Sequence, residues 1–246
     1  MNQIKPLGRK CYGSIGHLPA SRLGPGDHRI NDGQARILTV KTRDRHDRVI
    51  VCEKLDGSNV AVANVGGAIL ALGRSGYLAQ TSSYEQHQLF AAWVRDNSDR
   101  FAFLKEGERV CGEWLAQAHG TRYRLTHDPF VAFDIMREDE RALFEQISPR
   151  LTEAGLAMPK LLFMGQGQSF AVVDAMKALG EFGFHGALEP AEGAVWRVER
   201  MGKVDFLGKY VRPDKVDGRY LPELSGTEAL WNWRPPRQGS DDTHPS

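Results

Sequence analysis

Short apolar runs bounded by turn residues recur along the chain, and each predicts a β-strand. Two of them, residues 49–52 and 60–63, flank the dipeptide Asp56-Gly57, which is typical of a hairpin turn. The others cover residues 36–41, 68–73, 110–115, 130–135, 160–164, 194–198 and 204–207. The pattern therefore predicts about nine short strands, several of them joined by tight turns.

Apolar residues at helical spacing predict three helices between these strands. In the first, the apolar positions 89, 90, 93 and 94 share one face, and Ser82 or Ser83 can cap its start. The second covers residues 138–156 with an interruption at Pro149, and the third runs from a cap at Ser169 to about residue 181. Strands and helices alternate irregularly, which favours an α+β fold with largely antiparallel sheets over a doubly wound βαβ fold.

Composition divides the chain into three segments. Residues 1–36 are rich in Gly, Pro and Arg and predict an irregular N-terminal arm packed on the domain, which itself covers residues 37–224. Residues 225–246 are polar and Pro-rich, and we expect them to be partly disordered. Near the start of this tail, Trp231 and Trp233 are expected to pack against the domain.

The charges nearly cancel, because 32 Lys and Arg against 31 Asp and Glu give a net charge of +1. No global positive field therefore favours nucleic-acid binding, and a polyanion site would have to be a local patch. Two clusters are candidates for RNA binding, and each also fits a solvated rim: Arg43, Arg45 and Arg48 in one polar loop, and Arg122 and Arg124 in another.

The three cysteines are odd in number and lack metal-ligand spacing. This pattern predicts buried, reduced thiols in a cytoplasmic protein. The first residues lack the apolar segment of a secretion signal, and no apolar run is long enough to span a membrane.

Four charged residues interrupt strands that are otherwise apolar: Glu113, Asp134, Glu192 and Lys209. A charge on a core strand costs several kcal/mol unless it is paired or binds a ligand. A buried salt bridge would account for any one of them. Together with Lys54 and Arg74, they suggest one polar cavity shared between sheets.

Lys54 closes the apolar run that precedes Asp56-Gly57, so its amine is expected at a fixed point on a sheet. A lysine amine is protonated at neutral pH and becomes a nucleophile when burial or a neighbouring cation lowers its pKa. Taken alone, Lys-x-Asp-Gly favours a plain hairpin turn beside an exposed lysine over a functional site.

Five motifs follow one another in the chain: EKLDGSN (53–59), RSG (74–76), GEW (112–114), FVAFDI (130–135) and EGAVWR (192–197). In this order they resemble the motifs of ATP-dependent RNA ligases. These enzymes belong to the covalent lysyl-nucleotidyltransferase superfamily, together with DNA ligases and mRNA capping enzymes. The Asn that ends the first motif favours the RNA ligases.

The resemblance implies a nucleotidyltransferase fold, with mostly antiparallel sheets flanked by helices in a manner similar to ATP-grasp proteins. It also implies a role for each motif residue. For the reaction itself, it implies that Lys54 attacks the α-phosphate of ATP and becomes lysyl-AMP, that Lys209 binds the α-phosphate, and that Glu192 holds Mg²⁺ or Mn²⁺. For binding of the nucleotide, it implies that Phe133 stacks on the base, that Glu53 reads adenine chiefly through its backbone, and that Glu113 accepts hydrogen bonds from the ribose hydroxyls. Asn59 and Arg74 are implied to lie near the phosphate and sugar.

One motif departs from the family pattern. The family usually has Lys-x-Lys near position 209, whereas residues 206–212 contain one lysine. Lys203 or Arg212 supplies the second cation, or the site uses one fewer. Mg²⁺, Lys209 and Arg74 are expected to supply positive charge around the transferred phosphate and to lower the pKa of Lys54.

The resemblance implies a three-step reaction that joins an RNA 3′-hydroxyl to a 5′-phosphate through lysyl-AMP and an adenylylated 5′ end. A partner protein or a dimer could replace the C-terminal domain that many relatives carry. Two alternatives stay open. One is another covalent nucleotidyltransferase, acting on DNA ends or forming caps, and the other is a non-catalytic adenylate- or RNA-binding module.

Overall fold

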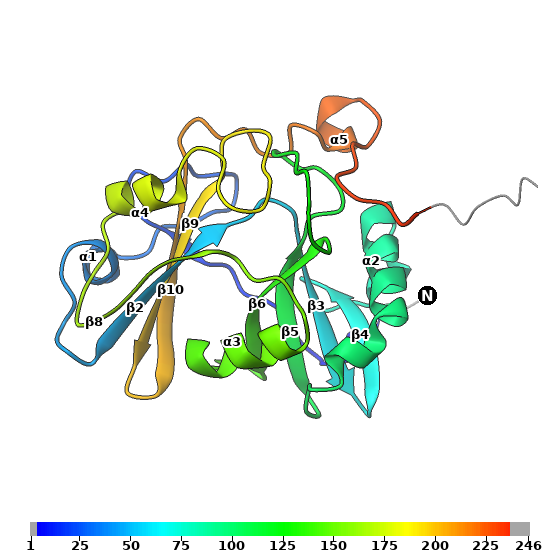
Figure 1. The fold of residues 1–246 in the computed structure, drawn as a ribbon, viewed down its shortest axis with the longest axis horizontal. Coiled ribbons are helices and arrows are strands. Elements are labelled where there is room, and N and C mark those ends of the chain that lie inside the picture. The colour runs from blue at the N-terminus through cyan, green and yellow to red at the C-terminus, as the bar shows by residue number, and fades with distance from the viewer. Residues whose placement is uncertain (1–3, 237–246) are drawn as a thin grey trace, which may run out of the picture.

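The computed structural model describes residues 4–236, which form two five-stranded sheets (Figure 1). Sheet A has the strand order β1 (Gly16–His17), β10 (Lys203–Val211), β9 (Gly193–Arg200), β2 (Asp47–Lys54) and β8 (Leu161–Gln166). Sheet B has the order β4 (Ala68–Gly73), β3 (Ser58–Val65), β5 (Glu108–Trp114), β6 (Phe130–Arg137) and β7 (Glu140–Arg141). Every strand pairing in the two sheets is antiparallel except that of β1 with β10. The predicted α+β fold with largely antiparallel sheets is confirmed.

Helices cover the outer face of each sheet. They are α1 (Asp32–Thr39) and α4 (Val172–Leu179) on sheet A, and α2 (Glu85–Asp96) and α3 (Phe144–Glu153) on sheet B. The short helices η1 (Ala79–Thr81), η2 (Ser98–Phe101) and α5 (Pro222–Ser225) lie in connecting segments. Leu38 of α1 and Ala175 of α4 share a core with Val49 of sheet A, and Phe90 of α2 and Ile147 of α3 share one with sheet B. Because side chains alternate along a strand, the other face of each sheet is left to line the space between the sheets.

The strand expected at residues 36–41 is wrong, because most of this segment is the second half of α1. Asn31 caps the helix, and its side chain accepts a hydrogen bond of 2.8 Å from the backbone N–H of Gln34. Ala35 and Leu38 then face the core. The cap and first turn lie upstream of the apolar run, so the run alone carried no helical signal.

The turn at Asp56-Gly57 connects the two sheets, so the predicted hairpin is wrong. β2 pairs with β8 and β9, whereas β3 pairs with β4 and β5. Glycine is required at position 57 because a Cβ there would lie 2.5 Å from the carbonyl oxygen of Trp114. The turn therefore brings the end of β2 directly against β5 of the other sheet.

The helices expected at residues 82–97, 138–156 and 169–181 exist but begin later. α2 follows Tyr84, and Ser82 accepts from the backbone N–H of Tyr84 at 3.2 Å instead of capping the helix. α3 begins only after a turn and β7, and Pro149 lies inside it without ending it. α4 has Ala171 at its N-cap, so Ser169 does not cap it.

The N-terminal arm runs from sheet B to sheet A. Cys11 and Tyr12 are buried against the inner face of sheet B, with Ala61 and Cys111 among their neighbours. Residues 16–17 then pair with β10 at the edge of sheet A. The boundary expected at residue 36 falls within α1.

At the other end, Trp231 and Trp233 pack against the core of sheet B, and the rings of Trp233 and Trp114 lie 5.8 Å apart. The predicted packing of these two tryptophans is confirmed. The last part of the tail expected to be disordered, residues 237–246, lies outside the described residues.

Cys11, Cys52 and Cys111 form no disulfide. Cys11 and Cys111 are buried, whereas Cys52 is half-buried, which corrects the expectation of buried thiols at that position. None of the helices within residues 4–236 has the length and apolar character needed to cross a bilayer.

Candidate active site

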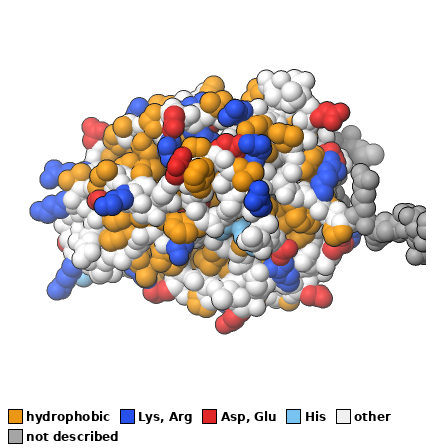
Figure 2. All heavy atoms as spheres, turned by 45° about the horizontal axis from the view of Figure 1, so that its top comes forward, with side chains coloured by type: hydrophobic (Ala, Val, Ile, Leu, Met, Phe, Trp, Pro, Cys, Tyr) orange, Lys and Arg blue, Asp and Glu red, His pale blue; other side chains and the backbone are white. Residues whose placement is uncertain are grey.

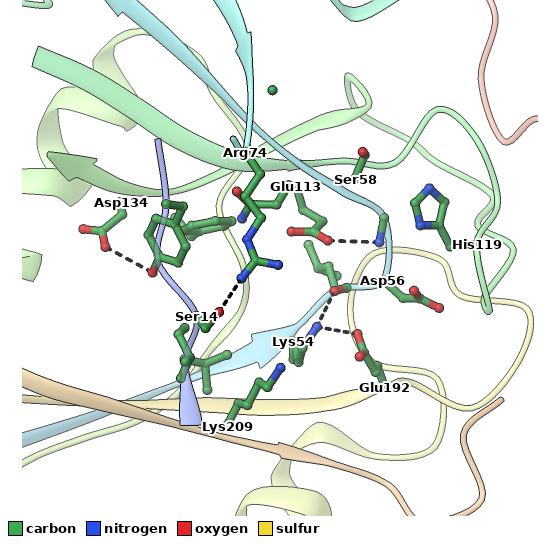
Figure 3. A pocket seen from close by; sticks show the side chains of 18 of the residues that line it. Ser14, Lys54, Asp56, Ser58, Arg74, Glu113, His119, Asp134, Glu192 and Lys209 are labelled. Atoms are coloured by element: carbon green, nitrogen blue, oxygen red, sulfur yellow. Dashed lines mark hydrogen bonds and ion pairs between the residues drawn. The ribbon is translucent and has the colours of Figure 1, made fainter. Parts of the chain in front are cut away.

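A cavity of about 1160 Å³ lies between the two sheets. Its lining includes all the charged residues for which the sequence suggested a shared cavity: Lys54, Arg74, Glu113, Asp134, Glu192 and Lys209. Figure 3 shows these side chains reaching the same region from both sheets. Sites for small molecules usually enclose about 300–1,000 Å³, so this cavity has room for a nucleotide and part of a second reactant.

Sheet A forms one wall, and its register places the two lysines. Lys54, the last residue of β2, lies opposite Gly193 of β9, and Lys209 of β10 lies opposite Val195. Both lysines therefore face the cavity, on either side of β9 and two residues apart in register. From strand spacing and rise, their Cα atoms are about 12 Å apart, a gap that two long side chains can close around one bound group.

Phe133 reaches the cavity from the opposite wall through a β-bulge. On β5 and β6, Cys111 pairs with Asp134 and Gly112 pairs with Ala132, which leaves Phe133 as the extra residue. Phe133 and Asp134 both line the cavity as a result. A strictly alternating strand would present only one of the two.

Glu113 and Asn59 are register partners on β5 and β3 of the same wall. Glu113 Oε1 accepts a hydrogen bond of 3.1 Å from the backbone N–H of Gly57. Burial raises the pKa of Glu113 to about 7, against the opposing effect of Lys54. The side-chain oxygen of Asn59 is buried and lacks a hydrogen-bond partner among residues 4–236, so both side chains can accept from a ligand.

Lys54 is held by a buried carboxylate. Its Nζ lies 2.7 Å from Oε2 of Glu192 and 3.2 Å from the carbonyl oxygen of Leu55. Burial would lower the pKa of Lys54, but the charges of Glu192 and Glu113 outweigh burial and raise it. The prediction that neighbouring cations lower this pKa is therefore wrong for the protein alone. The amine stays protonated until the negative charge of Glu192 is taken up by another group.

Arg74 and Lys209 are each held by the N-terminal arm. Arg74 Nη2 donates to Ser14 Oγ at 3.2 Å (Figure 3), and Lys209 Nζ lies 3.4 Å from Oδ1 of Asp27. Burial and the charge of Lys54 lower the pKa of Lys209. The arm therefore contributes to the site, although its irregular, Gly- and Pro-rich sequence did not predict this.

Asp134 is accounted for by ion pairs. Its oxygens lie 2.9 Å from Arg141 and 3.2 Å from Arg197, and the hydroxyl of Tyr12 donates to it at 3.3 Å. For this residue the alternative explanation, a buried salt bridge, is the correct one.

Glu53 is among the lining residues, but its carboxylate is engaged by the loop before β9. Both carboxylate oxygens lie 3.2 Å from the backbone N–H of Phe184, which donates to them. Burial raises the pKa of Glu53 to about 7. A Cβ at Gly183 would lie 2.1 Å from Glu53 Oε1, so glycine is required for this approach.

Neither candidate for the second cation lines the cavity. Lys203 lies at the far end of β10, and Arg212 Nε is 3.3 Å from Asp214. A different lysine, Lys215, is buried with its Nζ 2.8 Å from Asp56. Its charge is balanced by that carboxylate, and it fixes the turn that follows Lys54.

None of the five arginines predicted to bind RNA lines the cavity. Three form ion pairs: Arg43 with Asp47 (2.7 Å) and Asp205 (2.6 Å), Arg48 with Glu145 (2.8 Å), and Arg122 with Glu189 (2.5 Å). Arg45 and Arg124 are exposed and form no ion pair within residues 4–236. Figure 2 shows one face of the molecule, on which Lys and Arg side chains are scattered among hydrophobic and acidic ones.

Several lining residues were missed from the sequence. Those from the arm and the start of α2 include Lys10, Tyr12, Ser14, His17, Arg22, Asp27, Tyr84 and His87. His87 joins Ser58 of the first motif (2.9 Å) to Ser82 (2.8 Å). One signal was available in the sequence, because His17 and Ser21 lie within residues 15–22, the least irregular part of the arm.

The described residues contain no group of three or more His, Cys, Asp or Glu that could hold a metal ion. Mg²⁺ in nucleotide sites is commonly held by one or two carboxylates together with phosphate oxygens. A single buried carboxylate at Glu192, facing the cavity, fits that arrangement.

The sequence model of the family described as RNA ligase matches residues 47–211, more than half of the chain. The matched segment contains Lys54, all five motifs and Lys209. The chain therefore belongs to the RNA ligase family. No curated protein matches it.

Solved structures share the fold. A Naegleria gruberi RNA ligase, solved as a variant with ATP and Mn, is 16% identical with a TM-score of 0.53, and the match covers 80% of this chain and 59% of that one. A putative ATP-dependent DNA ligase from Aquifex aeolicus is 16% identical with a TM-score of 0.50, covering 82% and 49%. An archaeal ATP-dependent RNA ligase is 21% identical with a TM-score of 0.49, covering 82% and 48%. The chain spans about half the length of the archaeal and Aquifex structures.

Proposed function

We propose that the protein is an ATP-dependent RNA ligase that joins RNA 3′-hydroxyl and 5′-phosphate ends through lysyl-AMP. The observation that carries this proposal is the position of Lys54. Its amine contacts a buried carboxylate at 2.7 Å and faces Lys209 across β9, in a cavity large enough for ATP. Membership of the RNA ligase family supports the substrate class.

In the first step Lys54 attacks the α-phosphate of ATP, and pyrophosphate leaves. Phosphoryl transfer needs in-line geometry and positive charge around the transferred group. Lys209 and Arg74 supply that charge from opposite walls of the cavity. Mg²⁺ or Mn²⁺ held by Glu192 and the phosphates would neutralise that carboxylate, and thereby lower the pKa of Lys54.

The remaining motif residues orient the nucleotide. Phe133, presented by the bulge, stacks on the adenine ring. Glu113 and the unpaired oxygen of Asn59 accept from the ribose hydroxyls and hold the sugar. Glu53 contributes through its backbone, because its carboxylate is occupied by Phe184.

In the later steps AMP passes to the RNA 5′-phosphate, and the RNA 3′-hydroxyl then displaces it. Of the candidate RNA-binding arginines, Arg45 and Arg124 are best placed to grip phosphates, since ion pairs occupy the other three. The proposal also includes further RNA contacts from a partner protein or a second copy of the chain. The three free thiols suit the cytoplasm.

Intact mass measured after incubation with ATP and Mg²⁺ tests the first step. We expect the wild-type protein to gain the mass of AMP and Lys54→Ala to gain none. Lys203→Ala, which removes a lysine outside the cavity, serves as the matched control and should still gain AMP. A wild-type protein that never acquires AMP would overturn the proposal.

The same assay separates the alternatives. GTP in place of ATP tests a capping-type enzyme, and nicked or single-stranded RNA and DNA with 5′-phosphate ends test the polynucleotide. Labelling with GTP rather than ATP, or sealing of DNA but not RNA, would replace the proposal by the corresponding alternative. AMP capture with no sealing of either polynucleotide would overturn the ligase step.

A further inference from the structure

The arm brings two titratable side chains to Lys209. β1 pairs in parallel with β10, which sets His17 opposite Lys209. The chain then loops out and returns, so that His17 also bridges Arg29. Asp27 lies within this loop, and His17, Asp27 and Lys209 all line the cavity.

A chain of polar contacts starts and ends on β10. The backbone N–H of Val211 donates to Ser21 Oγ at 2.9 Å, and Ser21 Oγ lies 2.7 Å from Nδ1 of His17. On the other side of the ring, His17 Nε2 lies 3.1 Å from Oδ2 of Asp27, whose Oδ1 is 3.4 Å from Lys209 Nζ. The Ser21 hydroxyl can donate either to Nδ1 of His17 or to the carbonyl oxygen of Arg22 at 3.3 Å, and His17 Nε2 forms no hydrogen bond within residues 4–236.

Asp27 is a fixed negative charge. Its Oδ2 accepts from the backbone N–H of Gly24 at 2.9 Å and lies 3.1 Å from Nε2 of His17, which is 1% exposed. Only Oδ1 is left for Lys209. Burial would raise the pKa of Asp27, but the bond from Gly24 and the charge of Lys209 outweigh burial and lower it.

Four charged or titratable groups face Lys209: Asp27 and His17 of the arm, Lys54 of β2, and Glu192 before β9. Burial and Lys54 lower the pKa of Lys209, whereas Asp27 and Glu192 raise it. Glu192 is engaged with Lys54 at 2.7 Å. Asp27 is therefore the carboxylate that offsets the repulsion between the two lysines at Lys209.

We propose that Asp27, fixed by the backbone N–H of Gly24 and in contact with His17, is a positioning residue that holds the ammonium group of Lys209 charged and over the cavity until the α-phosphate of a nucleotide replaces the carboxylate. This inference rests on the proposed function, because the phosphate is that of ATP. Strong charge-assisted contacts measure about 2.7–2.9 Å. The longer 3.4 Å contact between Asp27 and Lys209 suits a partner that is exchanged during the reaction.

The test is the rate of lysyl-AMP formation at ATP concentrations well below saturation, with saturating Mg²⁺, followed by intact mass across neutral and alkaline pH. Under these conditions the pH profile reports the groups of the free protein, in which Asp27 still contacts Lys209. Without Asp27, Lys209 loses its proton at lower pH, so the alkaline limb of the pH–rate profile should move to lower pH in Asp27→Asn. At alkaline pH we expect a loss on the order of ten- to a hundred-fold, the scale of a misplaced catalytic group. Asp27→Glu, which keeps the charge, should move the limb back towards the wild-type position.

The matched control is Asp205→Asn, which removes a β10 carboxylate paired with Arg43 at 2.6 Å outside the cavity. It should leave the profile unchanged. His17→Gln gives a second variant with Asp27 intact, and thermal melting reports whether each variant folds. An alkaline limb at its wild-type position in folded Asp27→Asn would overturn the inference, as would an equal shift in Asp205→Asn.

A readout without catalysis separates this inference from the proposed function. Titration of the Lys209 side chain by NMR should give a lower pKa in Asp27→Asn than in wild type. If the wild-type protein captures no AMP but this difference is found, the proposed function fails and the contact stands. If AMP is captured and Lys209 titrates identically in both proteins, the inference alone fails.

Discussion

Lys54 and Glu192 form a tighter contact than Lys209 and Asp27, at 2.7 Å against 3.4 Å, and the difference fits their chemistry. Lys54 must give up a proton before it can attack, so it needs a partner whose charge can be neutralised during the reaction. Lys209 must stay charged throughout, so it needs only an exchange of one anion for another. The two lysines share a wall of the cavity but require opposite control of their protons.

Removal of the Glu192 charge should free the Lys54 amine and still impair the enzyme. In Glu192→Gln the pKa of Lys54 should fall, because Glu192 is the strongest influence that raises it. We expect a small amine-selective reagent to label Lys54 faster near neutral pH, as measured by peptide mass spectrometry, while AMP capture decreases. Glu145→Gln, which removes a surface partner of Arg48, is the control. Unchanged labelling of Lys54 would contradict the role given to this ion pair.

At the scale of elements, two local departures from regular structure shape the site. The turn through Gly57 carries the chain from sheet A to sheet B, and the bulge at Phe133 brings an aromatic ring to the cavity. Both meet at β5, where a Cβ on Gly112 would lie 2.3 Å from the ring of Phe130. The motif glycines at positions 57 and 112 are therefore explained by close packing between strands.

Gly57→Ala should destabilise the protein and displace Lys54. A Cβ there would lie 2.5 Å from the Trp114 carbonyl oxygen and 2.9 Å from the Leu115 side chain, so the turn must move. Overpacking of this kind costs about 1–3 kcal/mol, measured as the free energy of unfolding in urea. Gly73→Ala, where a Cβ would meet nothing within 4 Å, is the matched control and should change stability little. Equal effects from the two substitutions would refute the packing argument.

For the whole molecule, the sequence pattern predicted the fold class and the packing of the C-terminal tryptophans, and it suggested a polar cavity. The resemblance to RNA ligases supplied the convergence of the motif residues on that cavity. Alternating strands carry this information, because their inward-facing charges stand out against apolar neighbours. The sheet to which each strand belongs was not predictable. Asp56-Gly57 has the composition of a hairpin, and only its contact with β5 of the other sheet shows that it is a crossing.

The parts of the site that the sequence missed depend on contacts between distant segments. Asp27 reaches Lys209 because a two-residue strand pairs with β10, and so short a strand leaves no pattern. The pKa of Lys54 was predicted in the wrong direction for a similar reason. The sequence placed cations near it, but the sign follows from the distance to Glu192.

His185, in the loop before β9, contacts the loop between β5 and β6, and it should make the stability of the protein depend on pH. This residue is 8% exposed, and its Nδ1 lies 2.8 Å from Nε2 of His127. Burial and His127 lower the pKa of His185 to about 4. An unfolded histidine has a pKa near 6.5, so the unfolded chain binds the extra proton first. The contribution of His185 to the free energy of unfolding therefore falls as the pH decreases from about 6.5 to about 4, by on the order of 2–3 kcal/mol.

His185→Gln removes this dependence, so the stability advantage of the wild type over the variant should be largest near neutral pH and shrink as the pH approaches 4. Urea unfolding at several pH values measures the difference. Glu53, whose pKa is raised to about 7 by burial, acts in the opposite direction, and its Oε2 lies 3.8 Å from His185 Nε2. His185→Gln is therefore compared in the wild-type and Glu53→Gln backgrounds. His46→Gln, at an exposed position, should show a constant difference from wild type. If the His185→Gln difference is equally constant, His185 is not held neutral between the loops.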